Sequence, residues 1–205
     1  MDKYITLYQS REISNQCKKL YELVSEPYFF IDIGVGKLDS EAWIMKKYWP
    51  ICSMIGFEPS KQRYEYLKET YPGLLVNEAV SNSFYVNGYD GVDFVLNCRE
   101  EEKKLYSPVT IGSITVDQLL SRCQVPKVVV WADVEGSELE VLKGASLSLG
   151  LGRIKALNLE LNKERVADGW CTADEVVEFL ARYNYVPVDM PKEFDHIDVI
   201  FIKEK

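Results

Sequence analysis

The sequence lacks a surplus of basic residues. Its 205 residues include 24 Lys and Arg against 32 Asp and Glu, which gives a formal net charge of −8. Binding to nucleic-acid phosphates depends mainly on clustered Lys and Arg, and an anionic membrane surface attracts the same side chains. The charge balance therefore argues against a nucleic acid or a membrane as the binding partner.

Long apolar runs and a secretion signal are missing as well. No run approaches the roughly 20 apolar residues that span a bilayer. The first residues, MDKYITLYQSREIS, lack the basic flank and the apolar core of a signal peptide. We therefore expect a cytoplasmic location.

Paired cysteines and histidines are also scarce. The five cysteines lie far apart and form no Cys-x-x-Cys motif, so a zinc knuckle, a redox dithiol and a disulfide framework all lack support. A Ser-His-Asp hydrolase would depend wholly on the only histidine, His196, which has no nucleophile beside it in EFDHID. The chemistry must therefore be sought in other side chains.

What the sequence does contain is an alternation of strand-like and helical patterns. Apolar and β-branched runs predict strands at 28–34, 52–59, 74–80, 127–134 and 156–161, with helical patterns between most of them. This alternation predicts an α/β fold with a mostly parallel sheet and helices on both faces. With 47% hydrophobic residues, residues 1–205 suffice for a single well-buried domain.

Local signals predict where several helices begin and how the sheet ends. Three pairs have the spacing of a capping box: Thr115 with Gln118, Ser137 with Glu140, and Thr172 with Glu175. After the last of these helices, two apolar runs flank the polar segment PKEFDH. They predict an antiparallel pair at one edge of the sheet.

Two segments stand apart from the alternation. Within residues 1–27, positions 5–25 predict an N-terminal helix that serves either as packing or as a lid. Residues 83–108 contain the hairpin signal Asn87-Gly88 between aromatic runs, followed by the charged segment REEEKK. This second segment is either a solvated hairpin and loop or a flap that faces the acceptor.

Acids and glycines stand where the predicted strands end. The first strand ends with Asp32, Gly34 and Gly36, the second with Glu58, and the fourth with Asp133. Ligands of open parallel sheets bind beyond the carboxyl ends of the strands. Glycines let a ligand approach the backbone, and an acid about one helix and strand later accepts hydrogen bonds from ribose hydroxyls. The strand ends therefore predict a site for a nucleoside cofactor.

The residues around the two glycines bear on which nucleoside binds. A dinucleotide fingerprint reads Gly-x-Gly-x-x-Gly, but Gly36 is followed by the segment KLD, so the third glycine is missing. A carboxylate at Asp32 would repel a pyrophosphate but attract an ammonium group or a sulfonium-bearing amino acid. Both features favour S-adenosylmethionine over NAD, and an NAD(P)-dependent oxidoreductase is the alternative enzyme.

Five motifs in succession resemble those of one family. They are FIDIG at 30–34, GFEPS at 56–60, SITVDQLL at 113–120, WADVEGSELEVLKGA at 131–145 and NLEL at 158–161. Together they resemble the FkbM-type S-adenosylmethionine-dependent methyltransferases. The resemblance implies a class I methyltransferase fold, which is a Rossmann-like three-layer sandwich with a mostly parallel seven-stranded sheet and an antiparallel C-terminal edge hairpin. It also implies O-methylation of a hydroxyl on a sugar, glycan or polyketide.

The resemblance further implies a cofactor site made at three strand ends. The methionine end of the cofactor would lie at Asp32, Gly34 and Gly36. Glu58 would bind the ribose, and the dipeptide Ala79-Val80 that ends the third strand would border the adenine.

Asp133 ends a buried central strand and is the candidate for the chemistry. Methyl transfer is an in-line displacement, so the protein mainly positions two reactants, and a hydroxyl acceptor benefits from a base. Asp133 beside the sulfonium is our candidate for that base. The alternative is that Asp133, Glu135 and Glu160 jointly bind Mg²⁺, which would acidify the acceptor hydroxyl.

The loop at 34–38 differs from the family pattern Asp-x-Gly-Ala-Asn-x-Gly, because Val35, Gly36 and Leu38 occupy its last positions. This difference keeps open a second class of function, a catalytically silent methyltransferase-like domain that binds a partner. The main prediction is a methyltransferase that acts on a hydroxyl of a small molecule or glycan.

Overall fold

The structure, a computed structural model, describes residues 2–25, 27–36, 41–90, 94–95, 104, 106–123 and 127–204. Part of the predicted cofactor loop, Lys37 and Leu38, lies outside these residues, as does most of the charged segment REEEKK. The four cysteines that the structure describes are free thiols.

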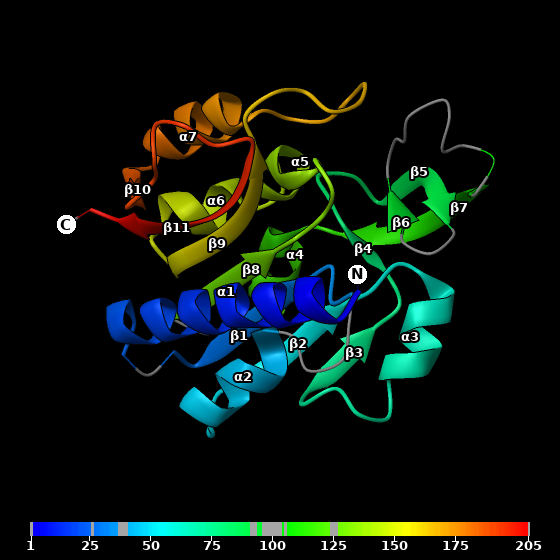
Figure 1. Ribbon diagram of the computed structural model, residues 1–205, viewed down its shortest axis with the longest axis horizontal. Coiled ribbons are helices and arrows are strands. Elements are labelled where there is room, and N and C mark those ends of the chain that lie inside the picture. The colour runs from blue at the N-terminus through cyan, green and yellow to red at the C-terminus, as the bar shows by residue number, and fades with distance from the viewer. Residues whose placement is uncertain are drawn as a thin grey trace.

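A seven-stranded sheet forms the centre of the fold (Figure 1), in the order β10-β11-β9-β8-β1-β2-β3. Five neighbouring strands run parallel, whereas β11 pairs antiparallel with both β9 and β10. This arrangement confirms the predicted α/β fold with an antiparallel C-terminal hairpin at one edge. The strands are β1 (Phe29–Ile33), β2 (Ser53–Phe57), β3 (Leu74–Val76), β8 (Val128–Ala132), β9 (Ile154–Asn162), β10 (Tyr185–Val188) and β11 (His196–Lys203).

The order of the strands reverses between β1 and β8. From β1 the chain moves outward through β2 to β3, and it then returns to the other side of β1 to form β8 and β9. Helices cover both faces of these central strands, so their sequences are apolar at nearly every position, as in FFIDI and VVVWA. Asp32 is the exception, and its register partners are Gly56 on β2 and Trp131 on β8.

Two helical layers enclose the sheet. Alternate residues of β1 and β8 face opposite layers, so Phe30 and Val129 pack toward α1–α3 while Ile31 and Val130 pack toward α4–α7. None of the helices within the described residues is long and apolar enough to cross a membrane. The helices are α1 (Asp2–Leu23), α2 (Glu41–Tyr48), α3 (Lys61–Leu67), α4 (Val116–Arg122), α5 (Glu138–Lys143), α6 (Ser146–Gly150) and α7 (Ala173–Ala181).

The predicted N-terminal helix is present as α1, which lies across one face of the sheet (Figure 1). Cys17 and Leu20 are fully buried in the hydrophobic cluster on that face. The amide of Gln16 donates to the backbone oxygen of Asp198 at 2.8 Å, which ties the helix to β11. These contacts give the second half of α1 a packing role, and its use as a lid stays a prediction.

The predicted strand at 74–80 is wrong as a single element. Residues Leu74–Val76 form β3 beside β2, whereas Ala79–Val80 form β4, which pairs with β7 (Ser107–Ile114) in a second, four-stranded sheet. The break lies at Asn77, whose side-chain amide donates to the backbone oxygens of Glu58 at 2.8 Å and Pro59 at 3.1 Å. That anchoring directs the chain from one sheet into the other.

The predicted turn at Asn87-Gly88 is also wrong. Both residues lie inside β5 (Tyr85–Asp90), which pairs antiparallel with β7 on one side and with β6 (Phe94–Val95) on the other. Asn87 faces Thr110 across the strand pair, and the Thr110 hydroxyl donates to its side-chain oxygen at 2.7 Å. Pairing with β7 therefore overrides the local turn signal.

Two of the three predicted capping boxes are confirmed, at Thr115 and at Thr172. The third is wrong, because the Ser137 side chain accepts no capping hydrogen bond from α5. Instead, Glu138 folds back and accepts from the backbone N–H of Val134 at 3.3 Å. The turn before α5 has two residues with positive φ, Glu135 at 49° and Gly136 at 82°.

We expect Thr115→Ala to lower the free energy of unfolding by about 1 kcal/mol, because the Gln118 N–H loses the partner that it now has at 2.9 Å. Ser137→Ala is the matched control and should cost clearly less, since no cap is lost. Urea denaturation of the two variants measures the difference. Equal losses would contradict the assignment of the caps.

Candidate functional site

A cavity of about 550 Å³ opens beyond the carboxyl ends of the parallel strands. It spans the reversal of strand order between β1 and β8, where ligands of such sheets bind, and its volume lies in the range of small-molecule sites, roughly 300–1,000 Å³. The structure brings six of the seven residues predicted for the cofactor to its wall: Gly34, Gly36, Glu58, Ala79, Val80 and Asp133.

The glycines after β1 are required by the backbone geometry. Gly34 has φ 83°, and a Cβ there would lie 1.9 Å from the backbone oxygen of Asp133. Gly36 has φ 66°, and its N–H donates to the Glu58 carboxylate at 3.0 Å. The absence of side chains thus lets the loop pass close to β8 and leaves its backbone at the cavity wall.

Glu58 is buried at the end of β2, with 3% of its surface exposed, and one edge of it lines the cavity. Its Oε2 accepts from Gly36 N at 3.0 Å and its Oε1 accepts from Ser60 N at 2.8 Å. A carboxylate has about four lone-pair directions, so it can accept hydrogen bonds from several donors at once. Glu58 therefore both shapes the glycine loop and offers an acceptor to the cavity.

Asp32 is the seventh predicted residue, and it lies behind the cavity wall. Its carboxyl group is fully buried, and the Tyr71 hydroxyl donates to Oδ2 at 3.2 Å. Burial, and secondly the charge of Glu41, raise the pKa of Asp32 well above its usual value. Glu41 at the start of α2 lines the cavity in its place.

Asp133, Glu135 and Glu160 meet at the ends of β8 and β9. One carboxylate oxygen from each lies within 4.8 Å of the others. Burial raises the pKa of Asp133 well above its usual value, and the neighbouring charge and hydrogen bond of Glu160 raise it further. The three acids proposed from the sequence are thus neighbours, and their mutual repulsion favours a proton or a cation between them.

His196 joins this cluster from the first position of β11. Its Nε2 lies 2.7 Å from Oε1 of Glu160, and that hydrogen bond raises the pKa of the imidazole. Sequence reasoning did not predict this contact, because the two residues lie far apart along the chain. The antiparallel register, which pairs His196 with Asn162, is the signal that would have revealed it.

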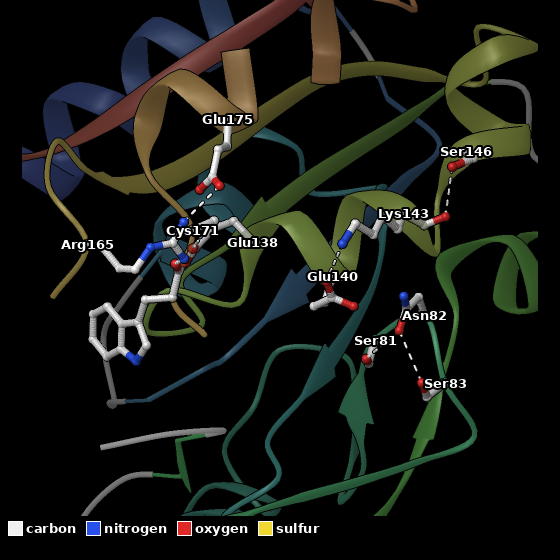
Figure 2. A network of polar contacts seen from close by, with 11 residues as sticks. Ser81, Asn82, Ser83, Glu138, Glu140, Lys143, Ser146, Arg165, Cys171 and Glu175 are labelled. Atoms are coloured by element: carbon white, nitrogen blue, oxygen red, sulfur yellow. Dashed lines mark hydrogen bonds and ion pairs between the residues drawn. The ribbon is translucent and has the colours of Figure 1, made fainter. Parts of the chain in front are cut away.

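Trp170 lines the cavity from the loop that follows β9. A Cβ on Gly136 would lie 2.2 Å from the indole ring, so glycine is needed for the ring to pack there. The ends of the loop are tied down, as Figure 2 shows for Arg165 and Glu175, which are 2.8 Å apart, and for Cys171 and Glu138, at 3.3 Å. Trp170 thus adds an aromatic ring to the cavity that the glycine loop also lines.

An apolar wall completes the cavity. It consists of Ile13 from α1, Val86 from β5 and Phe94 from β6. The N-terminal helix and the segment 83–108, which both stand apart from the alternation of strands and helices, therefore each contribute at least one side chain to the cavity.

Comparison with protein families gives one match. The description "Methyltransferase FkbM domain" matches residues 32–187, from the end of β1 to β10. No curated protein sequence matches the chain.

Solved structures of methyltransferases resemble the chain at low sequence identity. The plantazolicin methyltransferase BpumL in complex with SAH has a TM-score of 0.53 and 10% identity, over 100% of this chain and 87% of that one. A putative rRNA-methylase from Clostridium thermocellum has a TM-score of 0.49 and 11% identity, over 95% and 96%. Magnesium protoporphyrin IX methyltransferase (ChlM) from Synechocystis PCC 6803 with bound SAM has a TM-score of 0.47 and 7% identity, over 96% and 79%. The first of these supports a class I methyltransferase fold.

The buried carboxyl group of Glu138 leads to a prediction about how stability depends on pH. Burial raises its pKa to about 7, so the folded protein holds the Glu138 proton more tightly than the unfolded chain does. The stabilisation from this proton is complete below the usual pKa of Glu and is lost as the pH rises through about 7. Glu138→Gln should therefore gain stability relative to the wild type between about pH 4.5 and pH 7, by roughly 2–3 kcal/mol. Urea denaturation across this range measures the gain.

Glu140→Gln on the same helix is the control, because Glu140 lies at the surface in an ion pair with Lys143. Its effect should stay below about 1 kcal/mol. A pH-independent difference between Glu138→Gln and the wild type would show that Glu138 does not titrate as described.

Proposed function

Because the chain belongs to the FkbM methyltransferase family, whose domain matches residues 32–187, we propose that it transfers a methyl group from S-adenosylmethionine to a hydroxyl of a small molecule or glycan. The observation that carries the proposal is the single cavity that joins the glycine loop, Glu58 and Asp133 at the reversal of strand order. BpumL, which shares the fold, is complexed with SAH, and this supports the choice of cofactor.

The cofactor would lie across the ends of β1 and β2. Glu58 would accept hydrogen bonds from the ribose hydroxyls, and Gly34 and Gly36 would let the methionine end approach the backbone. The dipeptide Ala79-Val80 would border the adenine. The acids around the cavity favour a ligand that carries positive charge, as the sulfonium and the ammonium group of S-adenosylmethionine do.

We assign Asp133 as the base that takes the proton of the acceptor hydroxyl. The acceptor oxygen attacks the methyl carbon in line with the carbon–sulfur bond, the sulfur leaves as a neutral thioether, and the hydroxyl proton passes to the carboxylate. Burial and the neighbouring Glu160 raise the pKa of Asp133, so its carboxylate is a stronger base than an ordinary Asp.

A divalent cation is the alternative role for the same acids. The cluster of Asp133, Glu135 and Glu160 offers three carboxylate oxygens within 4.8 Å of one another. Such an oxygen-only donor set fits Mg²⁺ or Ca²⁺ better than zinc. When bound, the ion would lower the pKa of the acceptor hydroxyl, and Asp133 would then act as a ligand rather than as the base.

The acceptor would enter between the aromatic and the apolar walls. Trp170 offers a ring face, Phe94 and Val86 offer an apolar surface, and Asn162 and His196 offer polar groups at the same cavity. This mixture suits a hydroxylated ring such as a sugar, because the C–H face of a sugar packs on aromatic rings while its hydroxyls need polar partners. A cytoplasmic location remains part of the proposal.

The first test concerns Glu58 and the cofactor. Calorimetric titration of the wild type should show micromolar binding of S-adenosylmethionine and S-adenosylhomocysteine, and no binding of NAD⁺. Glu58→Gln should weaken both sulfur nucleosides at least about tenfold, since one hydrogen bond to a charged acceptor contributes roughly 1.5–3 kcal/mol. Glu65→Gln on the exposed side of α3 is the control.

Three outcomes would contradict parts of this assignment. Unchanged affinity in a folded Glu58→Gln protein would remove Glu58 from the site. Binding of NAD⁺ in place of the sulfur nucleosides would favour an oxidoreductase. Binding of neither would favour the silent domain that serves a protein partner.

The second test concerns Asp133. Asp133→Asn should bind S-adenosylhomocysteine within about threefold of the wild type but lose transfer of labelled methyl to a panel of sugars and phenols by roughly 10²-fold or more. Methyl transfer by the wild type in EDTA separates the role of Asp133 as a base from its role as a metal ligand. Methyl transfer that persists in EDTA supports the base, whereas transfer that returns only when Mg²⁺ is added supports the metal ligand. Full activity of Asp133→Asn would end both assignments.

A further inference from the structure

The first residue of α5, Glu138, is buried behind the candidate site, with 1% of its surface exposed. A helix can satisfy its first N–H groups with a threonine cap, as Thr115 and Thr172 do for α4 and α7. Such a cap places no charge in the interior, whereas a buried carboxyl group costs free energy. The start of a helix therefore does not by itself account for Glu138, and its two hydrogen bonds show what else it holds.

The first hydrogen bond is with the turn that brings Asp133 and Glu135 to the cavity. Oε1 of Glu138 accepts from the backbone N–H of Val134, which stands between the two acids, at 3.3 Å. Glu135 has φ 49°, a conformation that costs free energy in residues other than glycine. The hydrogen bond from Val134 therefore stabilises the backbone beside Asp133 in a turn that the local sequence does not favour.

The second hydrogen bond is with the end of the loop that carries Trp170. The Cys171 thiol donates to Oε2 of Glu138 at 3.3 Å (Figure 2), and the Cys171 backbone N–H donates to the Gly136 oxygen at 2.8 Å. The preceding residue, Trp170, packs its ring where a Cβ on Gly136 would lie only 2.2 Å away. The loop is therefore fastened to the same turn that carries Asp133.

One carboxyl group thus joins two parts of the cavity wall that lie far apart in the sequence. Asp133 and Trp170 both line the cavity, whereas Glu138 lies behind its wall. Its two oxygens accept from different segments. Because a closely packed side chain cannot follow both segments if they move apart, a shift of either one breaks a hydrogen bond.

We propose that Glu138 is a positioning residue, which holds the Asp133 turn and the Trp170 loop in one mutual arrangement, so that an acceptor packed on Trp170 presents its hydroxyl to Asp133. The inference rests on the proposed function, because it concerns the base and the acceptor wall of that reaction. In-line methyl transfer depends strongly on the alignment of the reacting groups. Glu138 supplies that alignment through Val134 and Cys171 without touching a reactant.

Cys171 offers a matched pair of substitutions. Cys171→Ala removes the donor to Glu138 and keeps the backbone hydrogen bond to Gly136, whereas Cys171→Ser keeps a donor in the form of a hydroxyl. With the panel of sugars and phenols, Cys171→Ala should raise the KM of the methylated compound roughly tenfold, and Cys171→Ser should stay within about threefold of the wild type. Equal losses in the two variants would show that the hydrogen bond is not what positions the loop.

Glu138 itself offers a second pair. Glu138→Met keeps the length of the side chain but removes both acceptors, so it should lower kcat by roughly tenfold or more in addition to raising KM. Glu138→Gln keeps an oxygen for Val134 and loses only the acceptor for Cys171, so it should resemble Cys171→Ala. Both variants should bind S-adenosylhomocysteine as the wild type does, because the proposed cofactor contacts lie at the ends of β1 and β2. Glu140→Gln, at the surface of the same helix, is the control.

A spectroscopic measurement tests the positioning without an acceptor. In ¹H–¹⁵N spectra the indole N–H signal of Trp170 is assigned by its loss in Trp170→Phe. Glu138→Met and Glu138→Gln should shift or broaden this signal, and Glu140→Gln should leave it in place. If Glu138 only began the helix, its substitution would move the amide signals of α5 and leave the Trp170 signal unchanged, and that result would overturn the inference.

The remaining outcomes distinguish the inference from the function on which it rests. If the wild type binds S-adenosylhomocysteine and transfers methyl, but Glu138→Met and Cys171→Ala do so equally well, the inference fails while the proposed function stands. If the wild type binds no sulfur nucleoside, the proposed function itself fails and takes the inference with it.

Discussion

The close approach of two strand ends is the constraint on which the site depends. The loop that leaves β1 passes so near β8 that a Cβ on Gly34 would lie 1.9 Å from the backbone oxygen of Asp133. Backbone hydrogen bonds fix this contact, from Gly34 N to Phe57 O at 2.9 Å and from Asp133 N to Ile33 O at 3.0 Å. The strand order reverses here, and the cavity opens directly above the contact.

Several carboxylates lie around that opening. Burying them close together costs free energy, which the rest of the fold must offset. Glu41, Glu58 and Asp133 line one cavity, and Asp32 lies behind its wall. Hydrogen bonds hold two of these acids: Glu58 accepts from two backbone N–H groups, and Asp32 accepts from the Tyr71 hydroxyl. Burial and neighbouring carboxylates raise the pKa values of Asp32 and Asp133, and a nearby positive charge would stabilise their ionised forms. A cationic cofactor is consistent with this distribution of charge.

The sequence allowed the sheet and most strand ends to be predicted, because period, composition and the position of glycines are local. It failed where tertiary pairing overrode local signals: Asn87-Gly88 lies within a strand that pairs with β7, and the chain changes sheets after Asn77. The contact of Cys171 with Glu138 and that of His196 with Glu160 join residues far apart along the chain. Only the register and the packing of helices on the sheet reveal them.

The most direct test of the central claim is a crystal structure of the protein with S-adenosylhomocysteine. The account predicts that the ribose hydroxyls lie within hydrogen-bonding distance of Glu58, that the adenine borders Val80, and that the sulfur faces Asp133. A nucleoside bound elsewhere, or bound in the cavity with its ribose away from Glu58, would contradict the account.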